Sequence, residues 1–169
     1  MASLGHMAIG LAAARLHHGI RTPQPSLPEP SLFLTMVFMS LLALLPDADV
    51  IAFTLRIPYE APFGHRGASH SIAAALACGM FWAVALWGFA RRRRISPLYV
   101  WGLISAVVAS HGLLDTLTDG GLGVALLWPL FNQRYFAPWQ PIPVAPIGAR
   151  LLSQRGMSVM LTELIYFAP

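Results

Sequence analysis

Apolar positions in this chain form long uninterrupted runs rather than the one-sided stripe of a surface helix. Runs of this kind, bounded by proline, glycine or charged residues, predict helices that are apolar on every side. The predicted helices cover Leu4–Leu16, Leu32–Leu45, Ser71–Ala90 and Leu98–Leu117. Ser71–Ala90 is the clearest membrane span, because its length matches the ~20 residues that a bilayer core requires. Leu4–Leu16 is shorter and is expected to lie at the membrane or partly through it.

Proline divides these runs and sets the expected loops. Four prolines make Thr22–Pro30 a loop, and Pro46 ends or kinks the second helix, which the apolar stretch Val50–Leu55 extends. The proline-rich residues 129 to 148 are expected to form a long irregular segment. Residues 158 to 167 are predicted to form a last short helix or a re-entrant element.

The composition is that of an integral membrane protein. Hydrophobic residues make up 56% of the chain and charged residues only 11%, with a mean hydropathy of +0.62. We therefore predict an all-α, integral membrane helical bundle, with four to five membrane-embedded helices and a Pro-rich C-terminal segment. The 169 residues suit a single domain over 1–169. All 11 basic residues are arginine, but no basic stripe alternates with aromatic residues, so nucleic acid is not an expected partner.

The run Arg91–Arg94 indicates how the helices are oriented. Such a cluster after a span is typical of a cytoplasmic anchor, and a binding site for anionic lipids or a partner is the alternative. If these arginines are cytoplasmic, the polar segments at the opposite helix ends are all extracytoplasmic. Inverting the whole topology would keep those segments together. They carry His6, Asp47 to Asp49, His65 to His70, and His111 to Asp115.

Histidine and aspartate dominate these polar segments, and imidazole with carboxylate is the ligand set that zinc and similar divalent ions prefer. His111 and Asp115 are four residues apart on one helical face, where a hydrogen-bonded pair is the alternative to a metal site. Asp47 or Asp49 can instead cap the following helix. Because ionisable groups are costly to bury near a membrane, a shared ion is the favoured interpretation. The metal ligands that we expect are His6, Asp49, His70, His111 and Asp115.

A tight turn around Gly67 carries further candidates, since His65 and His70 lie on either side of this flexible residue. His65 is expected to be a ligand or a proton donor. Substrate oxygens are expected to bind Arg66 and Arg134, because guanidinium binds phosphate with two parallel hydrogen bonds. For Arg134, an interfacial anchor is the alternative. The groups expected to orient ligands, transfer protons or assist catalysis are Asp47, His65 and Arg66.

Five motifs follow one another along the chain: Gly-His-x3-Gly from Gly5, Leu-Pro-Asp-x-Asp from Leu45, Gly-His-Arg-Gly-x-Ser-His-Ser from Gly64, His-x3-Asp-x2-Thr from His111 and Leu-Leu-Trp-Pro from Leu126. Their order resembles that of the YdjM-like family of membrane-bound metal-dependent hydrolases. The resemblance extends from Gly5 to about Pro143 and departs at Ser69, where the family commonly has Thr. It implies a hydrolase of the inner membrane.

A fainter similarity is to zinc-dependent phospholipase C and the P1-type nucleases, which also use an early His, then Asp, then His, then His-x3-Asp. This similarity would place ligands at His6, Asp49, His65 or His70, His111 and Asp115, with Asp115 able to bridge two ions. The later His and Glu ligands of those enzymes have no counterpart after Asp119. One or two ions are therefore expected rather than three.

Together these features predict a membrane-embedded hydrolase that uses one or two divalent ions, zinc first, to cleave a phosphoester in a lipid or lipid-linked substrate. The active site is expected on the extracytoplasmic face of the inner membrane. Two alternatives use the same residues without catalysis: a metal-ion carrier, transporter or sensor, and a structural protein whose polar clusters only join helices. The interiors of Leu32–Leu45 and Ser71–Ala90 contain no charge, which argues against a transport path.

Overall fold

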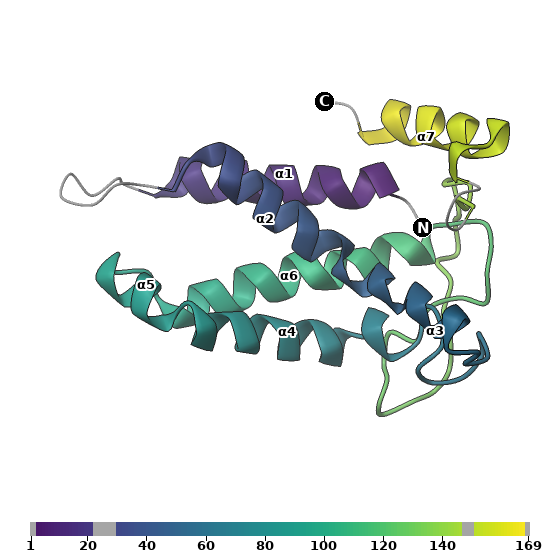
Figure 1. The fold of residues 1–169 in the computed structure, drawn as a ribbon, viewed down its shortest axis with the longest axis horizontal. Coiled ribbons are helices and arrows are strands. Elements are labelled where there is room, and N and C mark those ends of the chain that lie inside the picture. The colour runs from purple at the N-terminus through teal and green to yellow at the C-terminus, as the bar shows by residue number, and fades with distance from the viewer. Residues whose placement is uncertain (1–2, 22–29, 147–150, 168–169) are drawn as a thin grey trace.

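Four helices running alternately in opposite directions form the body of the protein (Figure 1). The computed structural model describes residues 3–21, 30–146 and 151–167. The four helices pack as α1 against α2, α4 against α6, and α2 against α6. Over the described residues, extended pairing is limited to two isolated bridges, so the expected all-helical class is confirmed. The four helices are α1 (Ser3–Ile20), α2 (Leu32–Leu44), α4 (Ile72–Ala85) and α6 (Pro97–Thr116).

Pro46 breaks the second helix as expected, because proline lacks the N–H that an α-helix needs at that position. The chain tightens there into η1 (Leu45–Val50), a 3₁₀-helix, and continues as the short α3 (Ile51–Thr54). Taken together, Leu32–Thr54 is long and apolar enough to cross a membrane, and so is Pro97–Thr116. The described part of the chain thus contains two candidate spans. The expected count of four to five embedded helices stays a prediction.

The third predicted helix is divided in two, which corrects the expectation of one helix over Ser71–Ala90. It ends at Ala85, and α5 (Trp87–Arg92) begins after Leu86. In addition, α1 extends four residues past the predicted end at Leu16. The last predicted helix is present as α7 (Gln154–Phe167).

Small residues let the helices approach closely, as is usual where helices pack in a membrane. A Cβ atom on Gly79 of α4 would meet the side chain of Ser105 on α6, and one on Gly10 of α1 would meet the backbone of Ser40 on α2. Alanine supplies much of the buried core between these contacts, including Ala43. Close backbone approach at these small residues therefore adds to the packing of larger core side chains such as Leu42 and Ile104.

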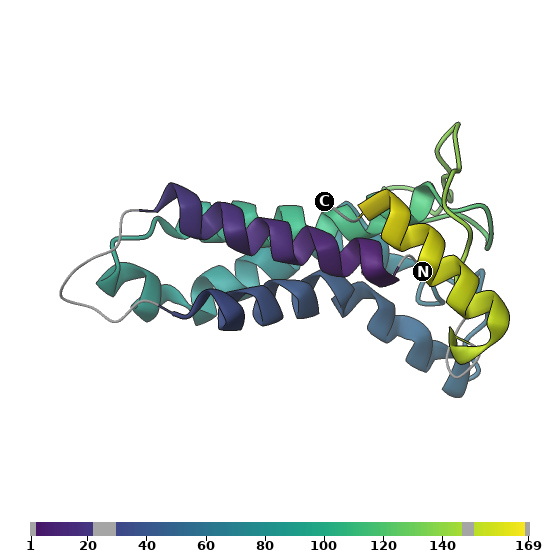
Figure 2. The same ribbon diagram turned by 90° about the horizontal axis from the view of Figure 1, so that it is seen from above.

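The two ends of the bundle differ in character. One end holds the start of α1, η1, α3, the 3₁₀-helix η2 (Ala68–His70) and the end of α6, with α7 packed across the start of α1 (Figures 1 and 2). The irregular segment after α6 lies at this end and is joined to it by backbone hydrogen bonds, such as Ala125 N–H to the Arg66 carbonyl. The other end holds α5 and Arg91–Arg94. The arginine cluster and the His/Asp segments therefore lie at opposite ends.

Candidate metal centre

Histidines and aspartates from four separate segments meet inside the first of these ends. His6 of α1, His111 and Asp115 of α6 are completely buried, and His65 is 2% exposed. Asp47 and Asp49 enter from η1, and His70 ends η2; the sequence prediction that these motifs converge is therefore confirmed. Two groups are close enough to hold an ion. They are Asp47, His70, His111 and Asp115, and Asp49, His65 and His70.

The first group, which we name the α6 cluster, brings four ligand atoms together. The Nε2 atoms of His70 and His111 face one another at 3.1 Å. Asp47 Oδ1 lies 3.4 Å from Nε2 of His111 and 3.6 Å from Nε2 of His70. Asp115 Oδ2 lies 3.6 Å from Nε2 of His70. An ion held tetrahedrally at about 2.0–2.2 Å needs ligand atoms roughly 3.3–3.6 Å apart. The three carboxylate–imidazole distances lie in this range and the distance between the two imidazole nitrogens is slightly shorter, so the spacing is close to that of a zinc site.

The second nitrogen of each imidazole already has a partner, and this fixes the tautomer. His111 Nδ1 is 2.7 Å from the Ala43 carbonyl, which can only accept, so Nδ1 carries the hydrogen. His70 Nδ1 is 3.1 Å from Asp49 Oδ2. Metal-binding histidines commonly donate their other N–H to a carbonyl or carboxylate in this way. Neutral forms of both rings therefore direct the lone pair of Nε2 into the α6 cluster.

The charge balance of the centre also calls for a cation. Asp47, Asp49 and Asp115 bring three carboxylates, and within the described residues the guanidinium of Arg66 forms an ion pair with Asp115. In the metal-free protein, His70 takes the compensating charge. Burial acts to lower the pKa of His70, but hydrogen bonds to Asp115, Asp47 and Asp49 outweigh it and raise the pKa to about 10. A divalent ion would supply the same compensation without this proton.

Asp49 is the centre of a hydrogen-bond network beside the α6 cluster. Its Oδ1 accepts from His65 Nδ1 at 2.6 Å, and its Oδ2 accepts from Ser69 Oγ at 2.5 Å and from the Arg66 backbone N–H at 3.0 Å. Both oxygens are thus occupied by donors that hold the turn before α4 in place. The His65 ring is stacked on Tyr59, with ring centroids 5.4 Å apart.

His6 lies next to the α6 cluster rather than within it. Its ring is stacked on His111 with centroids 3.7 Å apart, and its Nε2 is 3.4 Å from Asp115 Oδ1. Neither ring nitrogen has a hydrogen-bond partner among the described residues, although the side chain is fully buried. A buried imidazole without a hydrogen bond is unusual, and this one faces a group of metal-ligand type.

Arg66 is held in a demanding conformation at the edge of the centre. Its φ of 61° lies in the left-handed region that non-glycine residues rarely adopt, and its side chain is 1% exposed. Nε lies 2.9 Å from Asp115 Oδ2, and Nη1 donates to the Gly120 carbonyl at 2.8 Å. Nη2 has no hydrogen-bond partner among the described residues.

Arg134 has a different environment from the one expected for a substrate ligand. Nη1 donates to the carbonyls of His65 and Gly123, and Nη2 donates to those of Tyr59 and Ala61, at 2.8–3.3 Å. Its guanidinium also lies over the Tyr59 ring. These contacts fasten the segment that carries His65 to the segment after α6.

Glu163 of α7 is a buried acid that sequence reasoning did not place at the centre. Its Oε2 accepts from the backbone N–H groups of Leu4 at 2.8 Å and Gly5 at 3.4 Å, and thus caps the helix that carries His6. Burial raises the pKa of Glu163. The spacing of Gly156, Val159 and Glu163 places them on one face of the last helix, and the structure buries that face.

The fold and this centre define a helical membrane protein with a buried His/Asp group that could hold a metal ion. Residues 1–168 match the family described as YdjM inner membrane protein. The chain is also 38% identical over 158 residues to inner membrane protein YbcI of Escherichia coli (strain K12), an alignment that covers 92% of this chain and 86% of that protein. No solved structure matches. The chain therefore belongs to the YdjM family of inner membrane proteins. The fainter similarity to phospholipase C and P1-type nucleases is not supported by these comparisons.

Proposed function

We propose that this protein is a metal-dependent hydrolase of the inner membrane that cleaves a phosphoester in a lipid or lipid-linked substrate. The observation that carries the proposal is the α6 cluster, in which two imidazole Nε2 atoms face one another beside two carboxylates. Zinc is the proposed ion, because the donor set of two His and two Asp side chains and the spacing of the donor atoms suit it.

The proposed ligands are the four residues of the α6 cluster. This assigns direct binding to Asp47 and a positioning role to Asp49, which reverses the roles that the sequence suggested. Both carboxylate oxygens of Asp49 accept hydrogen bonds, from His65, Ser69 and Arg66. In contrast, Asp47 Oδ1 has no hydrogen-bond partner among the described residues. Because both oxygens of Asp49 already accept hydrogen bonds, we propose one bound ion rather than two.

A divalent ion in this position would supply Lewis acidity, lowering the pKa of a water molecule and polarising the scissile phosphoester. The residues around it are placed to assist. His65 donates from Nδ1 to Asp49, so its Nε2 can accept a proton, and its ring centroid is 5.7 Å from that of His70. Arg66 Nη2 is the donor proposed to hold a phosphate oxygen. Arg134 is proposed to position the segment containing His65 rather than to touch substrate.

The extracytoplasmic location of the centre is also a proposal. It is supported by the placement of Arg91–Arg94 at the far end of the bundle, since short positively charged segments favour the cytoplasmic side. Labelling of single cysteines introduced at exposed positions of the two ends, in intact cells, would test this orientation. The native Cys78 would first be replaced.

A non-catalytic metal site is the second candidate, and one observation favours it. The α6 cluster offers four protein ligands, and structural zinc sites are closed by four ligands whereas catalytic sites keep one position open. In this case the ion would stabilise the junction of η1, η2 and α6 without turning over any substrate.

The variant His65→Gln distinguishes the two candidates, because it leaves the α6 cluster complete. Detergent-purified wild type and variant would be compared for bound zinc and for hydrolysis of a panel of phospholipids and lipid phosphates, with and without chelator. The hydrolase proposal expects chelator-sensitive turnover in the wild type, and retained zinc with lost turnover in the variant. Stoichiometric zinc in both proteins, with no turnover of any substrate, would favour the non-catalytic site. Wild-type turnover that survives complete removal of metal would contradict both candidates as stated.

A further inference from the structure

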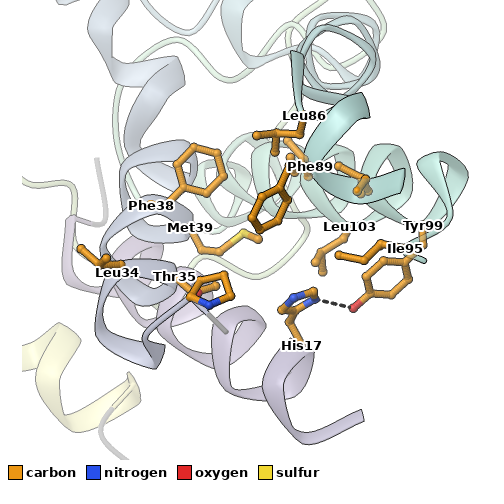
Figure 3. A pocket seen from close by; sticks show the side chains of 14 residues that line it. His17, Leu34, Thr35, Phe38, Met39, Leu86, Phe89, Ile95, Tyr99 and Leu103 are labelled. Atoms are coloured by element: carbon orange, nitrogen blue, oxygen red, sulfur yellow. Dashed lines mark hydrogen bonds between the residues drawn. The ribbon is translucent and has the colours of Figure 1, made fainter. Parts of the chain in front are cut away.

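A second feature lies at the opposite end of the bundle from the metal centre. A cavity of about 230 Å³ opens there between α1, α2, α5 and α6. Figure 3 shows side chains of α2 on one side of it and side chains of α5 and α6 on the other, with His17 of α1 below. The lining is almost wholly apolar and includes Leu34, Phe38, Met39, Leu86, Phe89 and Leu103.

The few polar side chains that line the cavity already have hydrogen-bond partners. His17 Nδ1 lies 3.0 Å from the Tyr99 hydroxyl, the contact drawn as a dashed line in Figure 3. Thr35 Oγ1 lies 3.0 Å from Nε2 of His18. An occupant that needs hydrogen bonds would have to break these pairs, so the cavity favours an apolar occupant. Its volume is below the ~300–1,000 Å³ of sites for drug-sized molecules, which suits part of one hydrocarbon chain.

The surroundings of the cavity are strongly positive. Six of the 11 arginines belong to the elements at this end, among them the exposed Arg91, Arg92 and Arg94. Two of them link neighbouring helices, since Arg21 Nη2 donates to the Arg93 carbonyl at 3.3 Å. Among described residues 7–21 and 86–100 there is no aspartate or glutamate. A ligand that combines a hydrocarbon chain with an anionic head would complement both parts of this end.

We propose that this end binds an anionic phospholipid, with one acyl chain in the cavity and the phosphate held by Arg91, Arg92 and Arg94. Anionic headgroups are attracted to clusters of basic residues beside membrane helices, and this end is the one that the positive-inside rule places at the cytoplasmic leaflet. The site is remote from the α6 cluster, so the lipid is a bound ligand rather than the substrate. The inference does not depend on the proposed hydrolase.

The experiment uses the full chain, stripped of native lipid in detergent. Phosphatidylglycerol, phosphatidylcholine with the same acyl chains and free glycerol phosphate would be titrated separately, with bound lipid counted by native mass spectrometry and the melting temperature followed in parallel. The proposal expects one tightly bound phosphatidylglycerol, weaker binding of phosphatidylcholine, and no binding of glycerol phosphate. Equal binding of the two lipids would overturn the anionic selectivity, and binding of glycerol phosphate alone would overturn the role of the cavity.

Two sets of variants test the two halves of the site. Replacing Arg91, Arg92 and Arg94 together by Gln should weaken phosphatidylglycerol binding about 100-fold, if each contributes about fivefold as expected near an anionic lipid. Arg155→Gln, which removes an exposed arginine from α7, is the matched control and should leave binding unchanged. Leu103→Trp should fill the cavity and displace the acyl chain, with Leu34→Trp at its exposed edge as the substitute if the first variant does not fold. Wild-type affinity in both the triple variant and a folded Trp variant would overturn the proposal.

Discussion

Replacing Asp47 and Asp49 separately by Asn tests which carboxylate touches the ion. The two residues are chemically identical and two positions apart in η1, so each variant is the matched control for the other. Asp47 Oδ1 lies 3.4 and 3.6 Å from the two imidazole nitrogens of the α6 cluster. Asp49 instead holds His70 through Nδ1 at 3.1 Å and acts on the ion only through that ring.

The expected magnitudes follow from these roles. Loss of a group that orients a metal-binding histidine typically lowers metal affinity ~10–100-fold, or about 1.4–2.8 kcal/mol, so Asp49→Asn should bind zinc more weakly but still fill at saturation. Asp47→Asn removes a charged ligand, so its zinc affinity should fall by more than that of Asp49→Asn. Stability should follow the opposite order, because Asp49 accepts short hydrogen bonds from His65 and Ser69 that Asn cannot fully replace. Losing two charge-assisted bonds would cost about 3 kcal/mol or more.

The assay combines competition of each purified variant with a zinc chelator and melting of the metal-free proteins. The cobalt-substituted forms add a spectroscopic measure of coordination. We expect Asp49→Asn to keep the wild-type cobalt spectrum at saturation and Asp47→Asn to change it. If Asp49→Asn lost the ion while Asp47→Asn kept wild-type affinity and spectrum, the assignment of ligands would be refuted. Wild-type affinity in both variants would refute the metal centre as a whole.

Three further predictions concern the supports of the centre. A Cβ on Gly112 would meet the His70 carbonyl, so Gly112→Ala should cost about 1–3 kcal/mol of stability and weaken zinc binding. Gly102→Ala on the same helix, where nothing lies within 4 Å, should leave zinc binding unchanged and raise stability by about 0.5–1 kcal/mol. Burial raises the pKa of Glu163, so its carboxyl group is protonated over a wider pH range in the folded protein than in the unfolded chain. The stability that this proton contributes is therefore lost as pH rises from the ordinary pKa of 4.5 through the raised pKa of the folded protein. The melting temperature of the wild type relative to Glu163→Gln should therefore fall as pH rises through that window, and a constant difference would contradict the burial argument. Arg134→Gln should increase amide hydrogen exchange in the segment whose carbonyls it binds; unchanged exchange with a raised KM would instead indicate contact with substrate.

The arrangement of the bundle was largely readable from the sequence. Uninterrupted apolar runs identify helices whatever those helices pack against. Pro46 ends one of them because proline lacks the backbone N–H, which is a property of the residue itself. Alternating passage of the chain through four helices brings the ends that carry His6, Asp47 and His111 together without any knowledge of packing. The helix break at Leu86 was not predicted, because no proline marks it in the sequence.

Only the tertiary structure decided which atoms face one another. Asp47 and Asp49 differ by two positions in sequence, yet a 3₁₀ turn and four hydrogen-bond donors from distant residues give them different partners. The same is true of Arg134, which is occupied by loop carbonyls, and of Glu163, which meets the start of α1 from 159 residues away. Periodicity and residue type are local properties and determine the helices and the chemistry available. The direction of a side chain and the partner of each donor depend on contacts between distant segments, and these exist only once the chain has folded.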